Sequence, residues 1–205
     1  MNNRTVIRSL VTNEGSIVAM DEGTIAWRPC IGTRTQTKLE ALTTVLLAVK
    51  GPNERYDSVV VGDSSGGISV LSLPRLEIID KFVVDGGIVR SVHAVSPNGQ
   101  KFMAATQDGS VWIVGSEVPG RCVKLFKHSG PVTSLRIDGE SIHIQSGWNR
   151  QTYDWCGEMK ERYDGNEKFL IKQRERNNRR ARILQSEQIR KEQSQPLMLD
   201  LPALG

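Results

Sequence analysis

The stretch Asp108-Gly109-Ser110-Val111-Trp112-Ile113 indicates most clearly how this chain of 205 residues folds. An Asp-Gly pair accepts the positive φ angles of a tight hairpin turn. The residues after the turn are mostly β-branched, aromatic or apolar, which is typical of a short strand. Lys101–Thr106, on the other side of the turn, has the same character. The stretch therefore predicts a β-hairpin centred on Gly109.

The same pattern occurs twice earlier in the chain, as Asp21-Glu22-Gly23-Thr24-Ile25-Ala26-Trp27 and as Ser65-Gly66-Gly67-Ile68-Ser69-Val70. The central glycines Gly23, Gly66 and Gly109 follow one another at intervals of 43 residues. A degenerate fourth copy follows as Arg150-Gln151-Thr152-Tyr153-Asp154. A fixed period in this range indicates a repeat architecture. We expect the three glycines to occupy equivalent corners of like-built units.

A second landmark is an apolar strand that carries a hydroxyl residue at the start of each unit. The hydroxyl residues are 35, 47 and 43 positions apart: Ser9, Thr44, Ser91 and Ser134. Variation of that size belongs in surface loops, where insertions have a small free-energy cost. The two landmarks together predict four units of similar construction.

Each unit is predicted to form four short antiparallel strands. In the third unit the strands are expected at Val89–Val95, Lys101–Thr106, Ser110–Val114 and Cys122–Phe126. Glycine, asparagine, aspartate and proline separate these segments, as turns require. No stretch before residue 166 has a convincing helical period. The expected class is therefore all-β.

The units resemble WD40-like repeats. The likeness is carried by the Asp-Gly-x-Val-x-Ile core at Asp108–Ile113 and by Val132-Thr133-Ser134-Leu135 in a first strand. Tyr153-Asp154 stands where the family often has Trp-Asp, and Pro97-Asn98-Gly99 resembles its common turn. Departures are the absence of a true Trp-Asp pair and a Gly-His dipeptide reduced to His128-Ser129-Gly130.

This resemblance implies a β-propeller of about four four-stranded blades over residues 1–164. A blade buries its faces only against neighbouring blades, so a row of four has two unsatisfied ends. Four blades can close as a small ring, or form an open half-propeller that a second copy or another partner completes. Both arrangements stay open at this point. In either arrangement the propeller is expected to be an interaction platform.

The charge of the chain is concentrated at its C-terminal end. Residues 1–165 hold 18 Lys and Arg against 18 Asp and Glu, whereas residues 166–205 hold 9 against 5 and so carry the net charge of +4. Residues 165–193 are rich in helix formers and are predicted to form a basic helix. Residues 194–205 are predicted to be an apolar peptide that either packs back on the rest of the chain or contacts a groove of a partner. Its candidate contact residues are Leu197, Met198, Leu199 and Leu201.

Five arginines lie within nine residues of the predicted helix: Arg174, Arg176, Arg179, Arg180 and Arg182. Such a run can neutralise phosphates, and it looks like arginine-rich segments that fold on RNA. It can equally contact an acidic protein partner or form a solvated helix face. In the body, Trp148 and Arg150 lie in or next to a predicted loop and are the candidate contact residues there.

The sequence offers little that indicates catalysis. Gly62-Asp63-Ser64-Ser65-Gly66-Gly67 resembles a serine-protease motif but contains an inserted serine and coincides with a predicted hairpin turn. No pair of histidines has metal-binding spacing. Cys30, Cys122 and Cys156 have no paired spacing, so neither a disulfide framework nor a zinc site is expected. We expect the three cysteines to be small buried apolar residues.

We therefore predict a non-enzymatic scaffold or adaptor subunit without a cofactor, metal or small-molecule substrate. The alternative is an RNA- or DNA-binding protein that uses Arg174–Arg182. Protein partners are expected, a homodimer that completes the propeller is possible, and a membrane partner is not expected. The longest apolar run, Val45–Val49, is far shorter than the roughly 20 residues that cross a bilayer. A cytoplasmic location is expected.

Overall fold

The computed structural model describes residues 5–96 and 100–165, together with residues 171, 175, 176 and 179. The chain divides into two compact units, Met1–Tyr163 and Asp164–Gly205. The described part of the first unit contains sixteen strands and one short 3-10 turn, Asp21–Gly23. The all-β prediction is confirmed for this unit. The predicted turn at Pro97–Gly99 lies outside the described residues.

The sixteen strands form four antiparallel sheets of four strands, each built from consecutive strands. Sheet 1 contains β1 (Val6–Val11), β2 (Gly15–Met20), β3 (Thr24–Pro29) and β4 (Thr35–Lys38). Sheet 2 contains β5 (Thr43–Lys50), β6 (Tyr56–Asp63), β7 (Gly67–Ser72) and β8 (Ile78–Val83). Sheet 3 contains β9 (Val89–Ala94), β10 (Lys101–Thr106), β11 (Ser110–Gly115) and β12 (Cys122–Lys127). Sheet 4 contains β13 (Ser134–Asp138), β14 (Ser141–Ser146), β15 (Asn149–Tyr153) and β16 (Met159–Tyr163).

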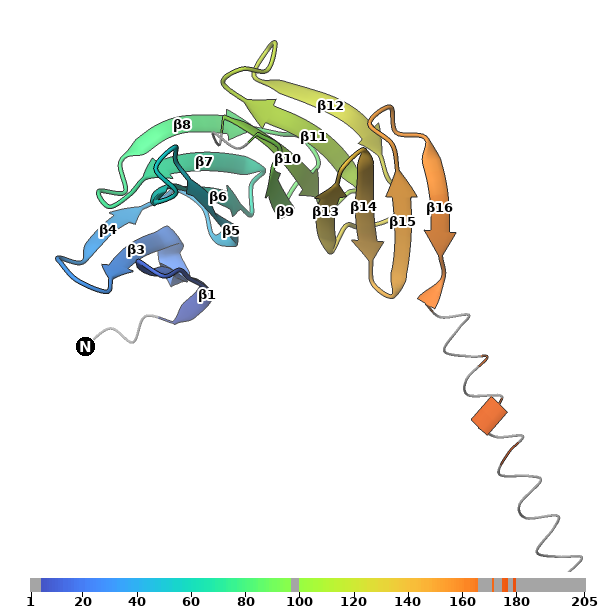
Figure 1. The fold of residues 1–205 in the computed structure, drawn as a ribbon, viewed down its shortest axis with the longest axis horizontal. Coiled ribbons are helices and arrows are strands. Elements are labelled where there is room, and N and C mark those ends of the chain that lie inside the picture. The colour runs from blue at the N-terminus through green and yellow to red at the C-terminus, as the bar shows by residue number, and fades with distance from the viewer. Residues whose placement is uncertain (1–4, 97–99, 166–170, 172–174, 177–178, 180–205) are drawn as a thin grey trace, which may run out of the picture. The chain divides into compact units, whose positions relative to one another are not determined.

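The four sheets follow one another along an arc, with sheet 1 and sheet 4 at its two ends (Figure 1). The first strand of each sheet, β1, β5, β9 or β13, contacts the first strand of the next. The strand bounds of sheet 3 agree with the sequence prediction to within one residue. The row is open, so of the two arrangements that the sequence left open, the structure has the open row of four sheets and not the closed small ring.

Three apolar cores join consecutive sheets. Because successive residues of a strand point to opposite faces, one strand serves two cores: Val59 and Val61 face sheet 1, and Val60 faces sheet 3. The core between sheets 1 and 2 includes Ile17, Ile25, Val59 and Leu71. The core between sheets 2 and 3 includes Val60, Ile68, Phe102 and Val114. The core between sheets 3 and 4 includes Met103, Val111, Ile142 and Ile144.

Gly23, Gly66 and Gly109 occupy equivalent corners, as the repeat predicts. Their φ angles are +74°, +91° and +93°. Each carbonyl oxygen accepts a hydrogen bond from the backbone N–H at the end of the fourth strand, at 2.9, 3.0 and 2.8 Å; the donors are Leu39, Val84 and His128. A Cβ at each glycine would lie 2.5 Å or less from the carbonyl oxygen of that same donor residue. Glycine is therefore required by both conformation and space.

Polar side chains at neighbouring positions connect the first strands: by register Thr44 is the bulge residue of β5, and Ser91 follows the bulge of β9. Thr44 donates to the carbonyl oxygen of Val89, which links sheets 2 and 3. The Ser91 hydroxyl accepts from the backbone N–H of Leu135 at 3.1 Å, which links sheets 3 and 4. The repeated hydroxyl residues of the sequence pattern therefore have a structural role at these two junctions.

In sheet 1 the position that corresponds to Ser91 is held by Arg8 and not by Ser9. The strand register pairs Arg8 with Ala19, which lies four residues before the corner glycine of sheet 1. In sheet 3, Ser91 pairs with Ala105, which also lies four residues before its corner glycine. Arg8 Nε donates to the carbonyl oxygen of Thr44 at 3.0 Å. The alignment of Ser9 with Ser91 is thus wrong by one residue. A bulge precedes this position in β1, β5 and β9 alike, so the bulge is a feature of the repeat.

The exposure of the three cysteines differs from the sequence prediction. Cys30 and Cys156 are exposed and Cys122 is half-buried, so the expectation of buried cysteines is wrong for the first two. Both exposed cysteines lie in turns between strands, where the neighbouring sheets do not cover them.

In the part of the chain that the structure describes, no helix is long and apolar enough to cross a membrane.

The predicted basic helix, residues 165–193, falls mostly outside the described residues. Gly165, Ile171, Glu175, Arg176 and Arg179 are described and have helical backbone. The remaining residues of that segment, and the predicted apolar peptide at 194–205, are not described. The helix and the peptide therefore remain predictions.

Candidate functional site

The stretch that resembles a protease motif is a structural turn. The Asp63 carboxylate accepts hydrogen bonds from Ser65 N, Ser65 Oγ and Gly67 N, each at 2.8 Å. Aspartate commonly caps a turn in this way through its own backbone neighbours. The serine hydroxyl is thus a donor to the aspartate, and no histidine takes part in these bonds. The turn explains the motif without chemistry.

Asp108 has the same role in sheet 3. Its carboxylate accepts from Thr106 Oγ1 at 2.8 Å, Ser110 N at 2.9 Å and Ser110 Oγ at 3.0 Å, and Lys127 Nζ lies 3.0 Å away. Partial burial alone would raise the pKa of Asp108, but these hydrogen bonds outweigh burial and hold the pKa far below its ordinary value. Asp108 is therefore an ionised cap of the Gly109 corner at neutral pH.

His128 belongs to a closed network between sheets 3 and 4. Its Nδ1 lies 2.8 Å from the Tyr153 hydroxyl, which donates to Gln151 Oε1. That order of donation requires the proton on Nδ1. Burial lowers the pKa of His128, against a smaller raising effect of Gln151, and burial raises the pKa of Tyr153. Tyr153 also stacks on Phe126 with ring centroids 4.7 Å apart. The network holds the two sheets together.

The other histidines show no sign of a metal or catalytic centre. His143 Nδ1 lies 3.0 Å from Thr152 Oγ1 on the same sheet. Burial lowers the pKa of His93, and the nearby charge of Arg136 lowers it further. Among the described residues, no three His, Cys, Asp or Glu side chains are grouped so that they could hold a metal ion. Interaction surfaces are therefore the candidate sites.

A large hollow lies between sheets 1 and 2, at the end where hairpin loops meet, and we call it the loop-end hollow. Its volume is about 940 Å³. Four loops contribute to it: residues 13–14, 29–31, 51–57 and 73–74. The apolar part of its lining is supplied by Trp27, Pro29, Ile31, Pro52, Tyr56, Leu73 and Pro74.

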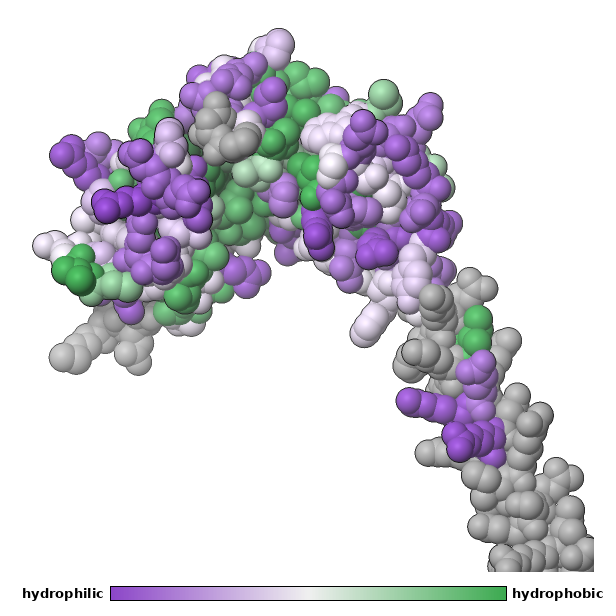
Figure 2. Space-filling model, in the orientation of Figure 1, coloured by the Kyte–Doolittle hydropathy of each residue, from purple (hydrophilic) through white to green (hydrophobic). Residues whose placement is uncertain are grey.

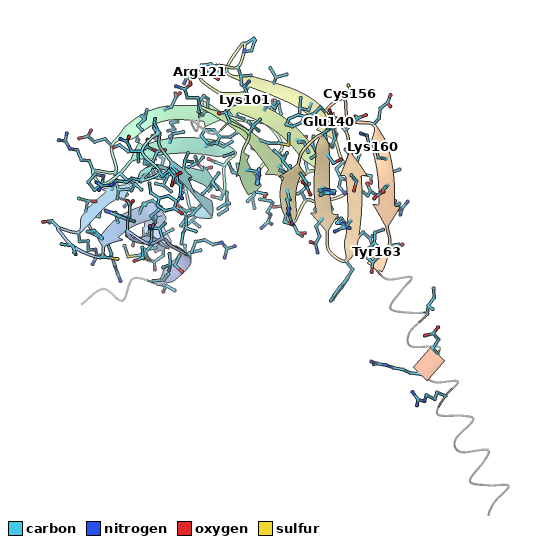
Figure 3. All side chains as sticks on the ribbon, in the orientation of Figure 1. Lys101, Arg121, Glu140, Cys156, Lys160 and Tyr163 are labelled. Atoms are coloured by element: carbon cyan, nitrogen blue, oxygen red, sulfur yellow. The ribbon has the colours of Figure 1, made fainter. Side chains whose placement is uncertain are left out.

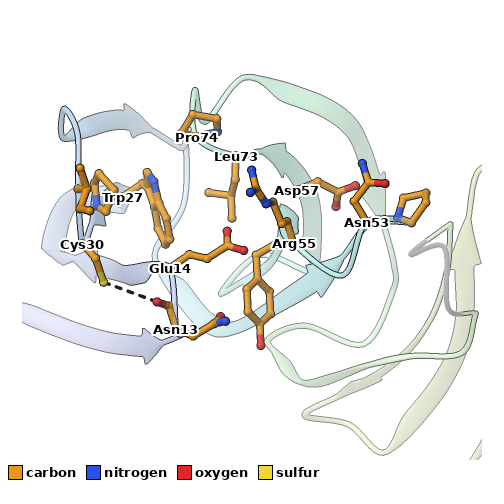
Figure 4. A pocket seen from close by; sticks show the side chains of 14 residues that line it. Asn13, Glu14, Trp27, Cys30, Asn53, Arg55, Asp57, Leu73 and Pro74 are labelled. Atoms are coloured by element: carbon orange, nitrogen blue, oxygen red, sulfur yellow. Dashed lines mark hydrogen bonds between the residues drawn. The ribbon is translucent and has the colours of Figure 1, made fainter.

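Charged groups project into the loop-end hollow from opposite sides. Glu14 comes from the first hairpin, and Arg55 and Asp57 come from the loop that leads into β6 (Figure 4). No ion pair joins Glu14 to Arg55 within the described part of the chain. Ile31 is 94% exposed at the rim. Apolar and charged groups are therefore both accessible in this hollow.

A second surface is the outer face of sheet 4, and we call it the end face. Strand pairing places three rows of side chains on it, of which the shortest is Asp138 and Ser141. The first row is Ser134, Gln145, Arg150 and Tyr163. The second row is Arg136, His143, Thr152 and Glu161. The residues between them, such as Ile142 and Ile144, point the other way into the core with sheet 3.

The end face is polar at positions that are apolar in the other sheets. By register, Gln145 corresponds to Ala105, and Arg150 corresponds to Val111. Ala105 and Val111 are fully buried, whereas Gln145 and Arg150 are exposed. A terminal repeat needs such a polar outer face. The surface of β14–β16 is accordingly mostly hydrophilic in Figure 2, where hydrophobic surface gathers around β9–β11.

The structure brings Trp148 and Arg150, the predicted contact residues of the body, to one place. Trp148 lies in the turn between β14 and β15 and is 79% exposed. It lines a hollow of about 320 Å³ with Gln145, Arg150 and Tyr163. Tyr163 ends β16 at the rim of this hollow (Figure 3).

The structure describes two of the predicted contact arginines of residues 166–205, which we call the tail. Arg176 and Arg179 are exposed. The others, and the predicted peptide contacts, lie outside the described residues: Arg174, Arg180, Arg182, Leu197, Met198, Leu199 and Leu201. Sequence reasoning missed the loop-end hollow, whose residues are up to 61 positions apart. It also missed Arg136, which the alternation of β13 after Ser134 could have placed on the end face.

Comparisons with known proteins bear on the fold alone. No protein-family model matches the chain, and no curated protein sequence matches it. Among solved structures, the chain is similar to the crystal structure of the computationally designed protein Ika8, with a TM-score of 0.63 and 17% sequence identity. The match covers 78% of this chain and 49% of the designed chain. The chain thus corresponds to about half the length of that protein.

Proposed function

We propose that this protein is a non-enzymatic adaptor that holds a segment of a partner protein in the loop-end hollow. The hollow itself is the observation that carries the proposal. It combines aromatic, proline and aliphatic surface with carboxylate and guanidinium groups. Aromatic residues and arginine are enriched where proteins bind one another, and loops on a rigid scaffold commonly carry such contacts.

The proposal includes a propeller-type arrangement of WD40-like sheets. Support comes from the repeated corners at Gly23, Gly66 and Gly109 and from the four consecutive four-stranded sheets. In this arrangement the loops between strands gather at the two ends of the sheets, and the loop-end hollow is formed where two such loop sets meet. The stacking of sheets makes the platform rigid, while the loops supply specificity.

The role of Arg55 provides the experiment. The full-length protein, an Arg55→Glu variant and a matched Arg90→Glu variant are each used to capture partners from cell extract, with quantitative mass spectrometry. Arg90 is an exposed arginine of sheet 3 that bonds Gln107, so its replacement makes the same charge change elsewhere. We expect at least one captured protein to lose about tenfold in recovery with Arg55→Glu and none of it with Arg90→Glu.

A fragment of that partner then binds the purified protein with a dissociation constant that Arg55→Glu raises by a similar factor. Two further changes, Glu14→Lys and Tyr56→Ala, test the opposite wall of the hollow. If every captured protein is recovered equally by wild type and Arg55→Glu, the hollow is not the partner site and the proposal fails.

A homodimer that completes a ring is the weaker candidate. Ring closure would place the end face of one copy against the outer face of sheet 1 of another. The first face carries Arg136, Arg150, Asp138 and Glu161, and the second carries Arg28 by strand register. Ring closure would take these charged groups out of water, which is costly unless each of them is paired. We therefore propose that the open row is the working form.

Nucleic-acid binding through Arg174–Arg182 is the second candidate function. The observation that favours it is the concentration of the whole net charge in residues 166–205. Arg176 and Arg179, the described members of the cluster, are exposed. Replacing all five arginines by glutamine in the full chain should then remove most of the salt-dependent binding to RNA or DNA. Unchanged binding would reject this function for the tail.

A further inference from the structure

We propose that the end face of sheet 4 binds single-stranded nucleic acid, with Trp148 stacking on a base and Arg136 and Arg150 contacting phosphates. This site is part of the folded body, and it does not depend on the loop-end hollow. Single-stranded nucleic acid is bound by surfaces that combine cationic groups for the backbone with aromatic groups for the bases. The end face supplies both on one sheet.

The aromatic part of the site is exposed without a structural reason. Trp148 sits in a two-residue turn, Gly147-Trp148, and is 79% exposed. Packing against the core cannot explain a tryptophan at this place, because the adjoining residues of the end face are polar. The hollow that it lines with Gln145, Arg150 and Tyr163, about 320 Å³, adjoins a second one of about 310 Å³ along β15 and β16. A base stacked on Trp148 would occupy the first hollow.

The cationic part consists of two arginines. Arg136 and Arg150 are exposed, and neither has an ion-pair partner within the described residues. The face also carries two carboxylates, Glu161 at the outer end of the second row and Asp138 on β13. Unpaired guanidinium groups beside an exposed indole match a ligand with alternating phosphates and aromatic bases. An apolar protein surface would leave both arginines desolvated and unpaired.

Gln145 adds a group that can contact a base edge. Its Nε2 donates to the carbonyl oxygen of Gly147 at 3.1 Å, which fixes the amide at the floor of the hollow. The Oε1 atom then remains an acceptor. Ser134 lies next to Gln145 in the first row and is exposed. Its counterpart Ser91 bonds the next sheet, and the row ends at sheet 4, so the Ser134 hydroxyl is available to a ligand.

The test uses the full chain and two fluorescein-labelled 15-mers, oligouridine and oligodeoxythymidine, titrated by fluorescence anisotropy at several salt concentrations. Trp148→Ala should raise the dissociation constant about tenfold, since one base–aromatic stack is lost. Arg136→Ala with Arg150→Ala should weaken binding and reduce the slope of log K against log salt by roughly 1.4, at roughly 0.7 per phosphate contact. The two probes show whether RNA, DNA or both are bound.

Matched controls separate this site from general charge and from the tail. Arg28→Ala with Arg90→Ala removes two exposed arginines from other sheets and should leave the dissociation constant unchanged within twofold. In a full chain whose five tail arginines, 174 to 182, are glutamine, binding weakens but still responds to Trp148→Ala. Circular dichroism confirms that each variant is folded.

Three results would overturn the proposal. Neither oligonucleotide binds at roughly 50 mM salt, a condition that favours phosphate contacts. Trp148→Ala and the Arg136/Arg150 double variant bind as tightly as wild type. The tail variant abolishes binding while the end-face variants do not, which would place the nucleic-acid site in the tail. Failure of the Arg55→Glu experiment would leave this proposal unaffected, because the two surfaces share no residue.

Discussion

Replacing Gly109 by alanine tests the repeated corner directly. The φ angle of +93° costs an L-residue about 1–2 kcal/mol. The added Cβ would also lie 2.3 Å from the carbonyl oxygen of His128 and 2.8 Å from that of Gly130, and both are backbone atoms. The chain after β12 must move, and it loses the 2.8 Å bond from His128 N to Gly109 O. A lost buried bond adds about 1–3 kcal/mol. We expect a total loss of about 3–4 kcal/mol of unfolding free energy.

Gly139→Ala is the matched control. Gly139 also has a positive φ angle, +55°, but a Cβ there would meet no atom within 4 Å. Its replacement should cost only about 1 kcal/mol. Urea unfolding followed by tryptophan fluorescence measures both, and at a slope of about 2 kcal/mol/M the Gly109→Ala midpoint should fall by roughly 1.5–2 M. If Gly109→Ala costs no more than Gly139→Ala, the corner is not built as described.

Three other predictions concern the sheets and their junctions. Phe102→Ala empties a fully buried site between sheets 2 and 3 and should cost about 3–5 kcal/mol by urea unfolding. Thr44→Val removes the bond to Val89 at nearly constant volume and should cost about 1 kcal/mol in the same assay, and no loss would mean that the junction bond is unimportant. Asp108 has a depressed pKa when folded, so its stabilisation is present above the unfolded value of about 3.9 and is lost as pH falls further. The stability gap between wild type and Asp108→Asn should therefore be larger at pH 7 than at pH 2, and an equal gap would show that the carboxylate is not held ionised by the fold.

The sheets could be predicted from sequence because their signals are local. A corner such as Gly109 is predicted by Asp-Gly followed by alternating apolar residues, and the strands on either side are predicted by their β-branched and aromatic content. Because the pattern repeats, the same prediction can be made for the other units. One misplaced landmark is Ser9: the position that matches Ser91 holds Arg8, and the neighbouring serine fits the composition although its side chain lies on the other face of the sheet.

The candidate surfaces could be predicted only in part. Trp148 and Arg150 are close in sequence, so a loop that contains both residues could be predicted. The loop-end hollow could not be predicted, because the stacking of two sheets brings Glu14 and Arg55 to the same hollow, and no local sequence pattern indicates that they are neighbours. Whether four units close into a ring depends on the twist between sheets. The polar residues His143 and Arg150, at positions that are apolar in other units, were the available sign that sheet 4 ends the row.

The central claim is that four like-built sheets pack only against their neighbours in the chain, and methyl NOE spectroscopy tests it most directly. The account predicts that the methyl groups divide into three connected groups. Ile17 should show contacts with Leu71, Val60 with the sheet 3 core, and Val111 with Ile144. Contacts between Ile17 and Ile144, which belong to the first and last cores, should be absent. An NOE between those two residues in the monomer, or no NOE between consecutive sheets, would contradict the account.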